Sequence, residues 1–333
     1  MPTLNDIASK LGISKGTVSK AINGADDISD ALRKEVLETA VEMGYSRICV
    51  NKKDTKKLVI FIRNMEYLKE EDFGYDIVMG FKKMAVPAGY QVDIVELTKE
   101  IEEEYSYEEF MLANNYEGAF VLGFNLFDTW LANFETSHTP LVLFDNMVKG
   151  NPFVSCVGVD TIESMEQIIS YLFELGHRKI GYLSSELGSY VYQQRHKAFL
   201  NTMIHYGLEH SSEYTGSDYD ARRCILNHLP RMLELGCSAI VCSHDELAHA
   251  LLAYCQEQDL RVPEDISVVG IDNLPLSATS NPPLTTIYQD KVQIGRAGYY
   301  ALSSQFADVH IGTLSLHPQL IIRQSCTYKK EEC

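Results

Sequence analysis

From residue 58 onward, short apolar segments alternate with helical segments, and this alternation restricts the possible folds more than any other feature. The strand-like segments are 58–62, 91–97, 118–123, 140–145, 157–160, 179–184, 238–243 and 267–272, and 161–175 and 245–258 are two of the helical ones. Near-continuous apolar strands separated by helices predict parallel sheets covered on both faces. With eight to ten such strands, we expect two doubly wound α/β subdomains rather than one sheet.

The first 45 residues instead show the pattern of three short helices. Thr3, Ser14 and Ser29 are placed to cap them, and glycines follow where the first two should end. Two short helices joined by a tight glycine turn and supported by a third form a helix-turn-helix motif. In that motif the second helix reaches base edges in the major groove. Periodicity alone also fits a helical trio without any DNA function.

The charge of the chain is divided unevenly. The formal net charge is −17, yet residues 1–57 hold ten Lys and Arg against eight Asp and Glu. The small head therefore tolerates a polyanion, whereas the acidic body is repelled by phosphate. Segment 46–57 is the most basic part, and we expect it to be a hinge or linker. The acidic run 99–110 is expected to be a solvated helix face.

The predicted DNA contacts lie on the second helix, on its flanks and in the basic segment. Long donors there alternate with small hydroxyl side chains, which suit base edges and phosphates respectively. The set is Thr3, Ser14, Lys15, Gly16, Thr17, Ser19, Lys20, Asn23, Lys52 and Lys53.

Acidic, amide and aromatic side chains gather where the predicted strands of the body end. In doubly wound sheets, ligands bind beyond the carboxyl ends of the strands. Planar polar groups can pair with vicinal hydroxyls while aromatic rings cover an apolar sugar face, so the set suits a polyhydroxylated ligand. An Asp after a strand is also a common helix cap, so each residue taken singly has a structural alternative. The candidates are Asn64, Phe73, Tyr75, Phe124, Asp145, Asp160, Arg195, Tyr219, His244, Asp245, Asp272 and Gln289.

The stretch 3–45 resembles the headpiece of lactose-repressor-type (LacI/GalR) transcription regulators almost throughout. In the body, R-H-K-A-F at 195–199, C-S-H-D-E-L-A at 242–248 and V-P-E-D-I-S-V-V-G-I-D at 262–272 are similar to motifs of the same family. The resemblance implies two lobes of periplasmic-binding-protein type, with Arg195 and Asp272 binding an effector between them. It also implies that His244 occupies a position where Asn is common.

The resemblance also defines the expected domains. We expect a headpiece at 1–45, a hinge at 46–57, one lobe formed by 58–157 with 288–316, and another formed by 158–287 with 317–328. The family's hinge carries a leucine that wedges into the minor groove. Here Arg47 and Asp54 replace its proline and leucine. Because a carboxylate cannot stack between bases, we expect a mainly electrostatic hinge along the phosphates.

The predicted function is that of a DNA-binding transcriptional regulator controlled by a small effector, with a sugar as the favoured effector. The expected partners are palindromic operator DNA and a second copy of the chain. Two alternatives remain: a sugar-binding module without DNA function, and a doubly wound sugar-processing enzyme. The enzyme alternative has little support, because the sequence contains no phosphate loop, nucleophile elbow or metal-ligand spacing.

Several absences complete the expectations. The eight cysteines form no C-x-x-C pair, and the chain starts without a basic segment followed by an apolar one. We therefore expect a cytoplasmic protein with reduced thiols, with no cofactor, metal or membrane span. No leucine heptads follow the last predicted strand, which favours a homodimer over a tetramer.

Overall fold

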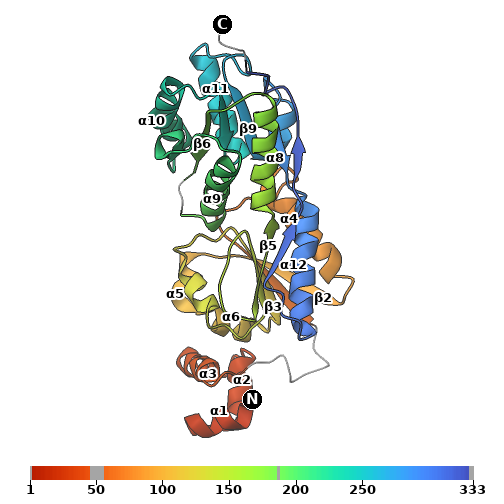
Figure 1. Cartoon of the computed structure of the whole chain (residues 1–333). Helices are drawn as coiled ribbons and strands as arrows, with labels where there is room; N and C mark the ends of the chain where they lie inside the picture. The colour runs from red at the N-terminus through yellow and green to blue at the C-terminus, as the bar shows by residue number, and fades with distance from the viewer. Residues whose placement is uncertain (1, 46–55, 186–187, 330–333) are drawn as a thin grey trace. The chain divides into compact units, whose positions relative to one another are not determined.

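The structure is a computed structural model, and it describes residues 2–45, 56–185 and 188–329. The headpiece consists of α1 (Leu4–Leu11), α2 (Lys15–Ile22) and α3 (Asp30–Glu42) (Figure 1). Their apolar faces form one core, in which Ile7, Val18 and Val36 are fully buried. The three predicted helices are therefore present and share a core.

Each headpiece helix begins at the predicted cap. Thr3 precedes α1, and its backbone N–H donates to the Asp6 carboxylate at 2.7 Å. Ser14 accepts a hydrogen bond from the backbone N–H of Thr17 at 3.0 Å, and Ser29 accepts one from Leu32 at 3.4 Å. These side chains satisfy N–H groups that a helix start otherwise leaves unpaired. The hydroxyls at the helix starts thus stabilise the helices independently of any contact with DNA.

The first sheet has the strand order β11-β5-β4-β3-β1-β2. Among its pairs, β1–β2, β1–β3, β3–β4 and β4–β5 run parallel. Its strands are β1 (Lys56–Ile62), β2 (Tyr90–Glu96), β3 (Gly118–Leu122), β4 (Leu141–Phe144), β5 (Val154–Val159) and β11 (Thr313–Leu316). The helices of this lobe are α4 (Phe73–Ala85), α5 (Lys99–Glu104), α6 (Tyr107–Asn114), α7 (Thr129–Phe134) and α12 (Lys291–Phe306).

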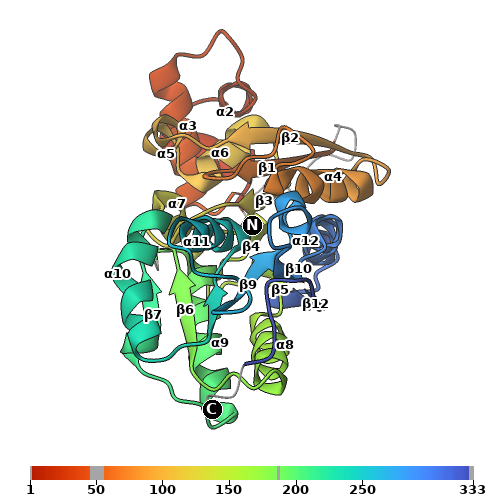
Figure 2. The same ribbon diagram turned by 90° about the horizontal axis from the view of Figure 1, so that it is seen from above.

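The second sheet has the order β12-β10-β9-β8-β6-β7, with only its β10–β12 pair antiparallel. Its strands are β6 (Ile180–Ser184), β7 (Thr215–Ser217), β8 (Ala239–Cys242), β9 (Ser267–Asp272), β10 (Thr285–Tyr288) and β12 (Gln319–Ile321). Its helices are α8 (Thr161–Glu174), α9 (Tyr190–His205), α10 (Ala221–Glu234) and α11 (Asp245–Glu257), with short 3₁₀ helices η2 (Ser212–Tyr214) and η3 (Pro275–Ala278). Figure 2 shows β7 at the edge of this sheet beside α10.

The chain passes between the two sheets three times. It leaves the first after β5, returns to it for β11, and then adds β12 to the second. The compact units are accordingly discontinuous. One comprises 1–68, 74–157 and 295–314, and the other comprises 69–73, 158–294 and 315–333. The predicted fold class, a helical headpiece with two doubly wound parallel-sheet subdomains, is confirmed.

Helices cover both faces of each sheet, as near-continuous apolar strands require. In the first lobe, Tyr107 of α6 and Trp130 of α7 pack with Phe61 of β1. In the second lobe, α8 and α9 contribute to one buried cluster, and α10 and α11 contribute to another. None of the helices in the described residues is long and apolar enough to cross a membrane.

The acidic run 99–110 is not simply a solvated helix face. The Glu102 side chain is 4% exposed and pairs with Arg63, and one Glu108 oxygen accepts the backbone N–H groups of His138 and Thr139. The expectation of a solvated face is therefore wrong for these two carboxylates. Ion pairing and backbone donors offset the cost of burying them.

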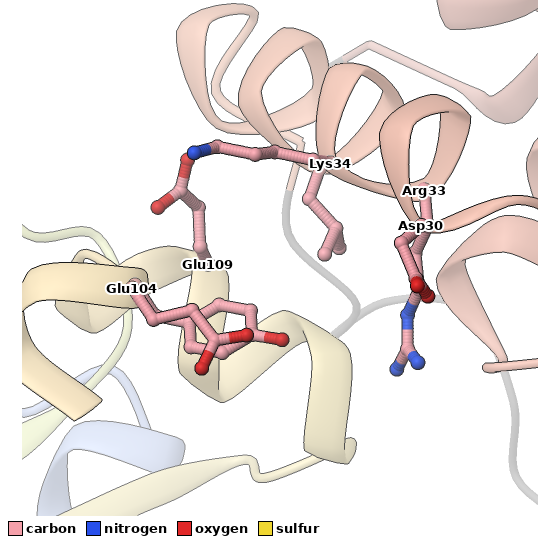
Figure 3. A pocket seen from close by; sticks show the side chains of 7 residues that line it. Asp30, Arg33, Lys34, Glu104 and Glu109 are labelled. Carbon is pink, nitrogen blue, oxygen red and sulfur yellow. The ribbon is translucent and has the colours of Figure 1, made fainter. Parts of the chain in front are cut away.

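Within the same compact unit, α3 of the headpiece packs against α6. Tyr105 and Leu112 extend the headpiece core. A small pocket at this contact is lined by Asp30, Arg33, Lys34, Leu37, Glu104, Tyr105 and Glu109. Figure 3 shows Lys34 extending from α3 toward Glu109. Lys34 of α3 thus faces part of the acidic run.

A buried carboxylate ties three segments of the second lobe together. Asp245, at the start of α11, has no exposed surface. It accepts the Thr286 hydroxyl at 2.6 Å, the backbone N–H of Leu274 at 2.9 Å, and the hydroxyl of Ser277. Gly270 lies so close that a Cβ there would stand 2.2 Å from an Asp245 oxygen. This interaction holds β10 and the turn after β9 against α11.

We expect Asp245→Asn to destabilise the second lobe by about 1–3 kcal/mol for each donor that loses its acceptor. Urea unfolding followed by circular dichroism measures the change. Trp130, the single tryptophan, lies in the first lobe, so its fluorescence reports separately on that lobe. Glu246→Gln, at the exposed neighbouring position, is the control. Equal stability of the two variants would contradict the assigned role of Asp245.

Candidate functional site

The predicted base-contacting side chains lie on the exposed surface of α2. Lys15, Gly16 and Lys20 are exposed, and Thr17 and Ser19 are half-buried. Val18, Ala21 and Ile22 face the headpiece core on the opposite side of the helix. The helix therefore presents cations and small hydroxyls to solvent on one side, as a helix that enters the major groove requires.

Three other predicted DNA contacts have partners inside the headpiece. The hydroxyl of Ser14 lies 2.9 Å from that of Thr17, and Thr3 donates to Asp6 at 2.8 Å. The Asn23 amide donates to the backbone oxygen of Ser19 at 2.7 Å. These side chains fix the ends of α1 and α2. Any phosphate contact that they make adds to this role.

The basic residues near the predicted hinge fall partly outside and partly inside the described part of the chain. Lys52 and Lys53 lie outside the described residues. Lys56 and Lys57, by contrast, begin β1, and the Lys56 ammonium stands 5.4 Å from the ring centroid of Tyr90. The end of the predicted 46–57 segment is thus part of the first sheet.

In the second lobe, the ends of β9 and β10 bring two polar side chains close to Arg195. The Arg195 guanidinium is 3.5 Å from the Asp272 carboxylate, and Gln289 donates to that carboxylate at 2.6 Å. Arg195 and Gln289 are 6% and 2% exposed. The side-chain oxygen of Gln289 is buried without a hydrogen-bond partner in the described part of the chain. An ion pair next to an unsatisfied amide suits a polar ligand that supplies the missing donor.

His244 forms the next part of this cluster, at the end of β8. Its ring nitrogens lie 2.9 Å from the Ser243 hydroxyl and 3.4 Å from the Ser185 hydroxyl. Burial, together with the nearby Arg195 charge, lowers the pKa of His244 to about 4. The ring is therefore neutral at physiological pH and can accept or donate one hydrogen bond at each nitrogen.

Tyr192, Ser185 and Ser243 also belong to this cluster but were not predicted from the sequence. The centroids of the Tyr192 and His244 rings are 5.4 Å apart, and the Arg195 guanidinium lies 5.9 Å from the centroid of the Tyr192 ring. Tyr192 precedes Arg195 by three positions in one helix, a spacing that places both on one face. That spacing was a usable signal, whereas the two serines carry none.

The other residues of this lobe that were predicted to bind an effector lie outside this cluster or have other hydrogen-bond partners. Asp160 caps α8 by accepting the N–H groups of Ile162 and Glu163 at 3.0 Å each. Tyr219 is 82% exposed. Asp245 is committed to the buried bonds described above, so we revise its prediction: it supports the ligand edge and has no surface to offer a ligand.

In the first lobe, the predicted residues also follow strand ends. Asn64 and Asp145 both have a φ of 50°, an uncommon conformation for a residue other than glycine, and Asp272 of the second lobe has 121°. Such conformations cluster at functional sites. Phe124 is 6% exposed and packs on Phe134, so it belongs mainly to the core.

Two aromatic predictions lie at the start of α4. Phe73 and Tyr75 are half-buried. The ammonium of Lys291 stands 4.8 Å from the Phe73 ring centroid. Among the described residues, no group of three or more His, Cys, Asp or Glu side chains could hold a metal ion.

Both the headpiece and the body of the chain match known protein families. Residues 3–47 match the family described as bacterial regulatory proteins, lacI family, and residues 169–326 match the periplasmic binding protein-like domain. The transcriptional repressor CytR of Escherichia coli is 26% identical over 97% of this chain and 96% of its own. The repressor PurR of Mannheimia succiniciproducens is 28% identical over 98% of each chain.

Solved structures share the fold over almost the whole length. The lac repressor dimer bound to operator aligns with a TM-score of 0.67 at 23% identity, over 98% of this chain and 99% of that one. The regulator CelR in complex with cellobiose aligns with a TM-score of 0.69 at 22% identity, over 98% and 100%. Headpiece and body therefore follow one another as in these regulators, and the chain combines a DNA-binding domain of the lacI family with a periplasmic binding protein-like domain.

Proposed function

We propose that this protein is a transcriptional repressor whose affinity for operator DNA is controlled by a polar small molecule bound at Arg195, Asp272 and Gln289. The observation that carries the proposal is the buried ion pair with its unsatisfied amide oxygen at the carboxyl edge of the second sheet. A buried unsatisfied oxygen is costly, and a ligand donor would remove that cost.

A saccharide is the favoured effector. Arg195 and Asp272 offer planar groups for vicinal hydroxyls, and Tyr192 offers a ring beside them. Two regulators of the same fold support this class, one described with cellobiose and one with bound ribose. A nucleoside also carries vicinal hydroxyls, and is the main competitor. Residues of the first lobe, including Asn64 and Asp145, remain predicted contributors.

The DNA partner follows from the headpiece. A single headpiece contacts one half-site, so a homodimer on a palindromic operator is the expected complex. Effector binding and operator binding then share one coupling free energy, typically ~1–3 kcal/mol, and each ligand changes the affinity of the other equally. Whether the effector weakens or strengthens DNA binding is decided by which conformation it favours.

The alternatives have less support. A binding module without DNA function would leave the exposed cations of α2 unexplained. The relatives that cover nearly the whole chain are named as repressors, which favours a regulator over a sugar-processing enzyme.

Lys15→Ala and Lys20→Ala should each reduce the preference for operator over random DNA by about 1–3 kcal/mol, because each removes a donor to base edges. Lys20 pairs with Asp27, so Asp27→Ala should tighten binding to both DNAs. An operator selected from a random duplex pool serves in fluorescence-anisotropy titrations. Lys10→Ala on α1 is the matched control. Equal losses on both DNAs would show that Lys15 and Lys20 contact phosphates only.

Arg195→Ala and Asp272→Asn should abolish the thermal stabilisation that an effector confers, while operator binding stays measurable. Each removes one charged partner of a buried polar ligand. A thermal-shift screen of mono- and disaccharides, sugar phosphates and nucleosides identifies the effector. Arg222→Ala, at an exposed ion pair with Glu257, is the control. Full shifts in the Arg195 and Asp272 variants would contradict the assigned site.

Acidification should destabilise the folded protein through His244. Its pKa falls from 6.5 to about 4 on folding, so between these values the unfolded state binds more protons and stability declines as pH falls. The decline is up to about 1.4 kcal/mol per pH unit. His244→Asn should remove this component from urea unfolding at pH 7 and pH 5, whereas exposed His205→Asn should not. Parallel pH profiles for wild type and His244→Asn would refute the assignment.

A further inference from the structure

A second pocket lies at the outer edge of the second sheet. It has a volume of about 160 Å³ and is lined by Tyr182, Ser184, His196, Thr215, Gly216, Ser217 and His228. These residues come from β6, β7, α9 and α10. None of the residues predicted to bind the effector lines it. The pocket is therefore a separate feature of this lobe.

Three buried polar atoms in this pocket lack hydrogen bonds. They are the hydroxyl oxygens of Tyr182 and Ser184 and the Nε2 atom of His196. Tyr182 and Ser184 are 0% and 2% exposed. Burial raises the pKa of Tyr182, and the nearby Arg195 charge and Ser184 hydroxyl partly offset this rise, so the Tyr182 and Ser184 hydroxyls lie close to each other. Few buried polar groups in native proteins are left in this state, so three together indicate a ligand.

The pocket walls are held by packing that does not use these polar atoms. The Tyr182 ring stacks on His196 at 5.5 Å and on Phe199 at 4.9 Å between centroids. Gly216 lets α10 approach the edge strand, because a Cβ at this position would stand 2.3 Å from the His228 ring. The rings are thus fixed while their polar atoms stay available. Such a site is pre-formed, which lowers the cost of binding.

The lining determines what kind of ligand fits. It contains hydroxyls and imidazoles but no Asp, Glu, Lys or Arg. Burial lowers the pKa of His196, so its ring is neutral at physiological pH. A cation would find no countercharge, and an anion would find no cationic side chain in the wall. Donors and acceptors at several points suit a neutral molecule with several hydroxyls.

The volume sets the size of that molecule. A dry cavity of about 150 Å³ holds one benzene molecule, which has six non-hydrogen atoms. Glycerol has the same number. We propose that this pocket is a second ligand site that takes one small neutral polyol, of about the size of glycerol, through Tyr182, Ser184 and His196.

The test is calorimetric titration of the full chain with ethylene glycol, glycerol and erythritol. Glycerol should bind one molecule per chain in a saturable manner. Tyr182→Phe keeps the stacked ring but removes the hydroxyl, and should weaken glycerol binding about tenfold. Ser184→Ala is the second variant and is titrated in the same way. Unfolding curves check that both variants are folded. Asp272→Asn should leave glycerol affinity unchanged within twofold, because Asp272 does not line this pocket.

Each remaining outcome would overturn the proposal. A non-saturable heat signal would show an adventitious additive only. A loss of glycerol binding in Asp272→Asn but not in Tyr182→Phe or Ser184→Ala would place the molecule at the effector cluster. Absence of binding for all three polyols in the wild type would mean that the unsatisfied atoms serve ordered water alone.

Discussion

Parallel pairing of β8, β9 and β10 brings three strand ends to one edge of the second sheet, and the Asp245 carboxylate fixes them there. The Arg195–Asp272 pair and the Gln289 amide depend on this arrangement, because Asp272 ends β9, Gln289 directly follows β10, and Asp245 holds β10 and the turn after β9. Their charged and amide groups are pre-positioned by hydrogen bonds that lie deeper in the lobe. A ligand that binds them does not have to order them.

Much of this arrangement could be predicted from sequence. The helix caps at Thr3, Ser14 and Ser29 were predictable because capping depends on local chemistry, and the long apolar strands were predictable because both sheet faces are buried. The strands β7 and β11 were missed, since segments of three or four residues with exposed positions carry no periodic signal.

The role of individual side chains was harder to predict. A carboxylate after a strand can cap a helix, as Asp160 does, pair with an arginine, as Asp272 does, or be buried, as Asp245 is. The three have the same local pattern, and only the turn that folds back over Asp245 distinguishes them. Arg195 and Asp272 were predicted from their place after strands and, more specifically, from the family resemblance, which carries information on tertiary structure that spacing does not.

The threefold passage of the chain between the sheets has a consequence for synthesis on the ribosome. The headpiece is complete by residue 45, whereas the first sheet waits for β11 and the second for β12, close to the end of the chain. At about 5–20 residues per second, the headpiece precedes the finished body by some tens of seconds. A DNA-binding unit thus emerges long before the part that controls it, and a prematurely terminated chain would release the headpiece without its regulation.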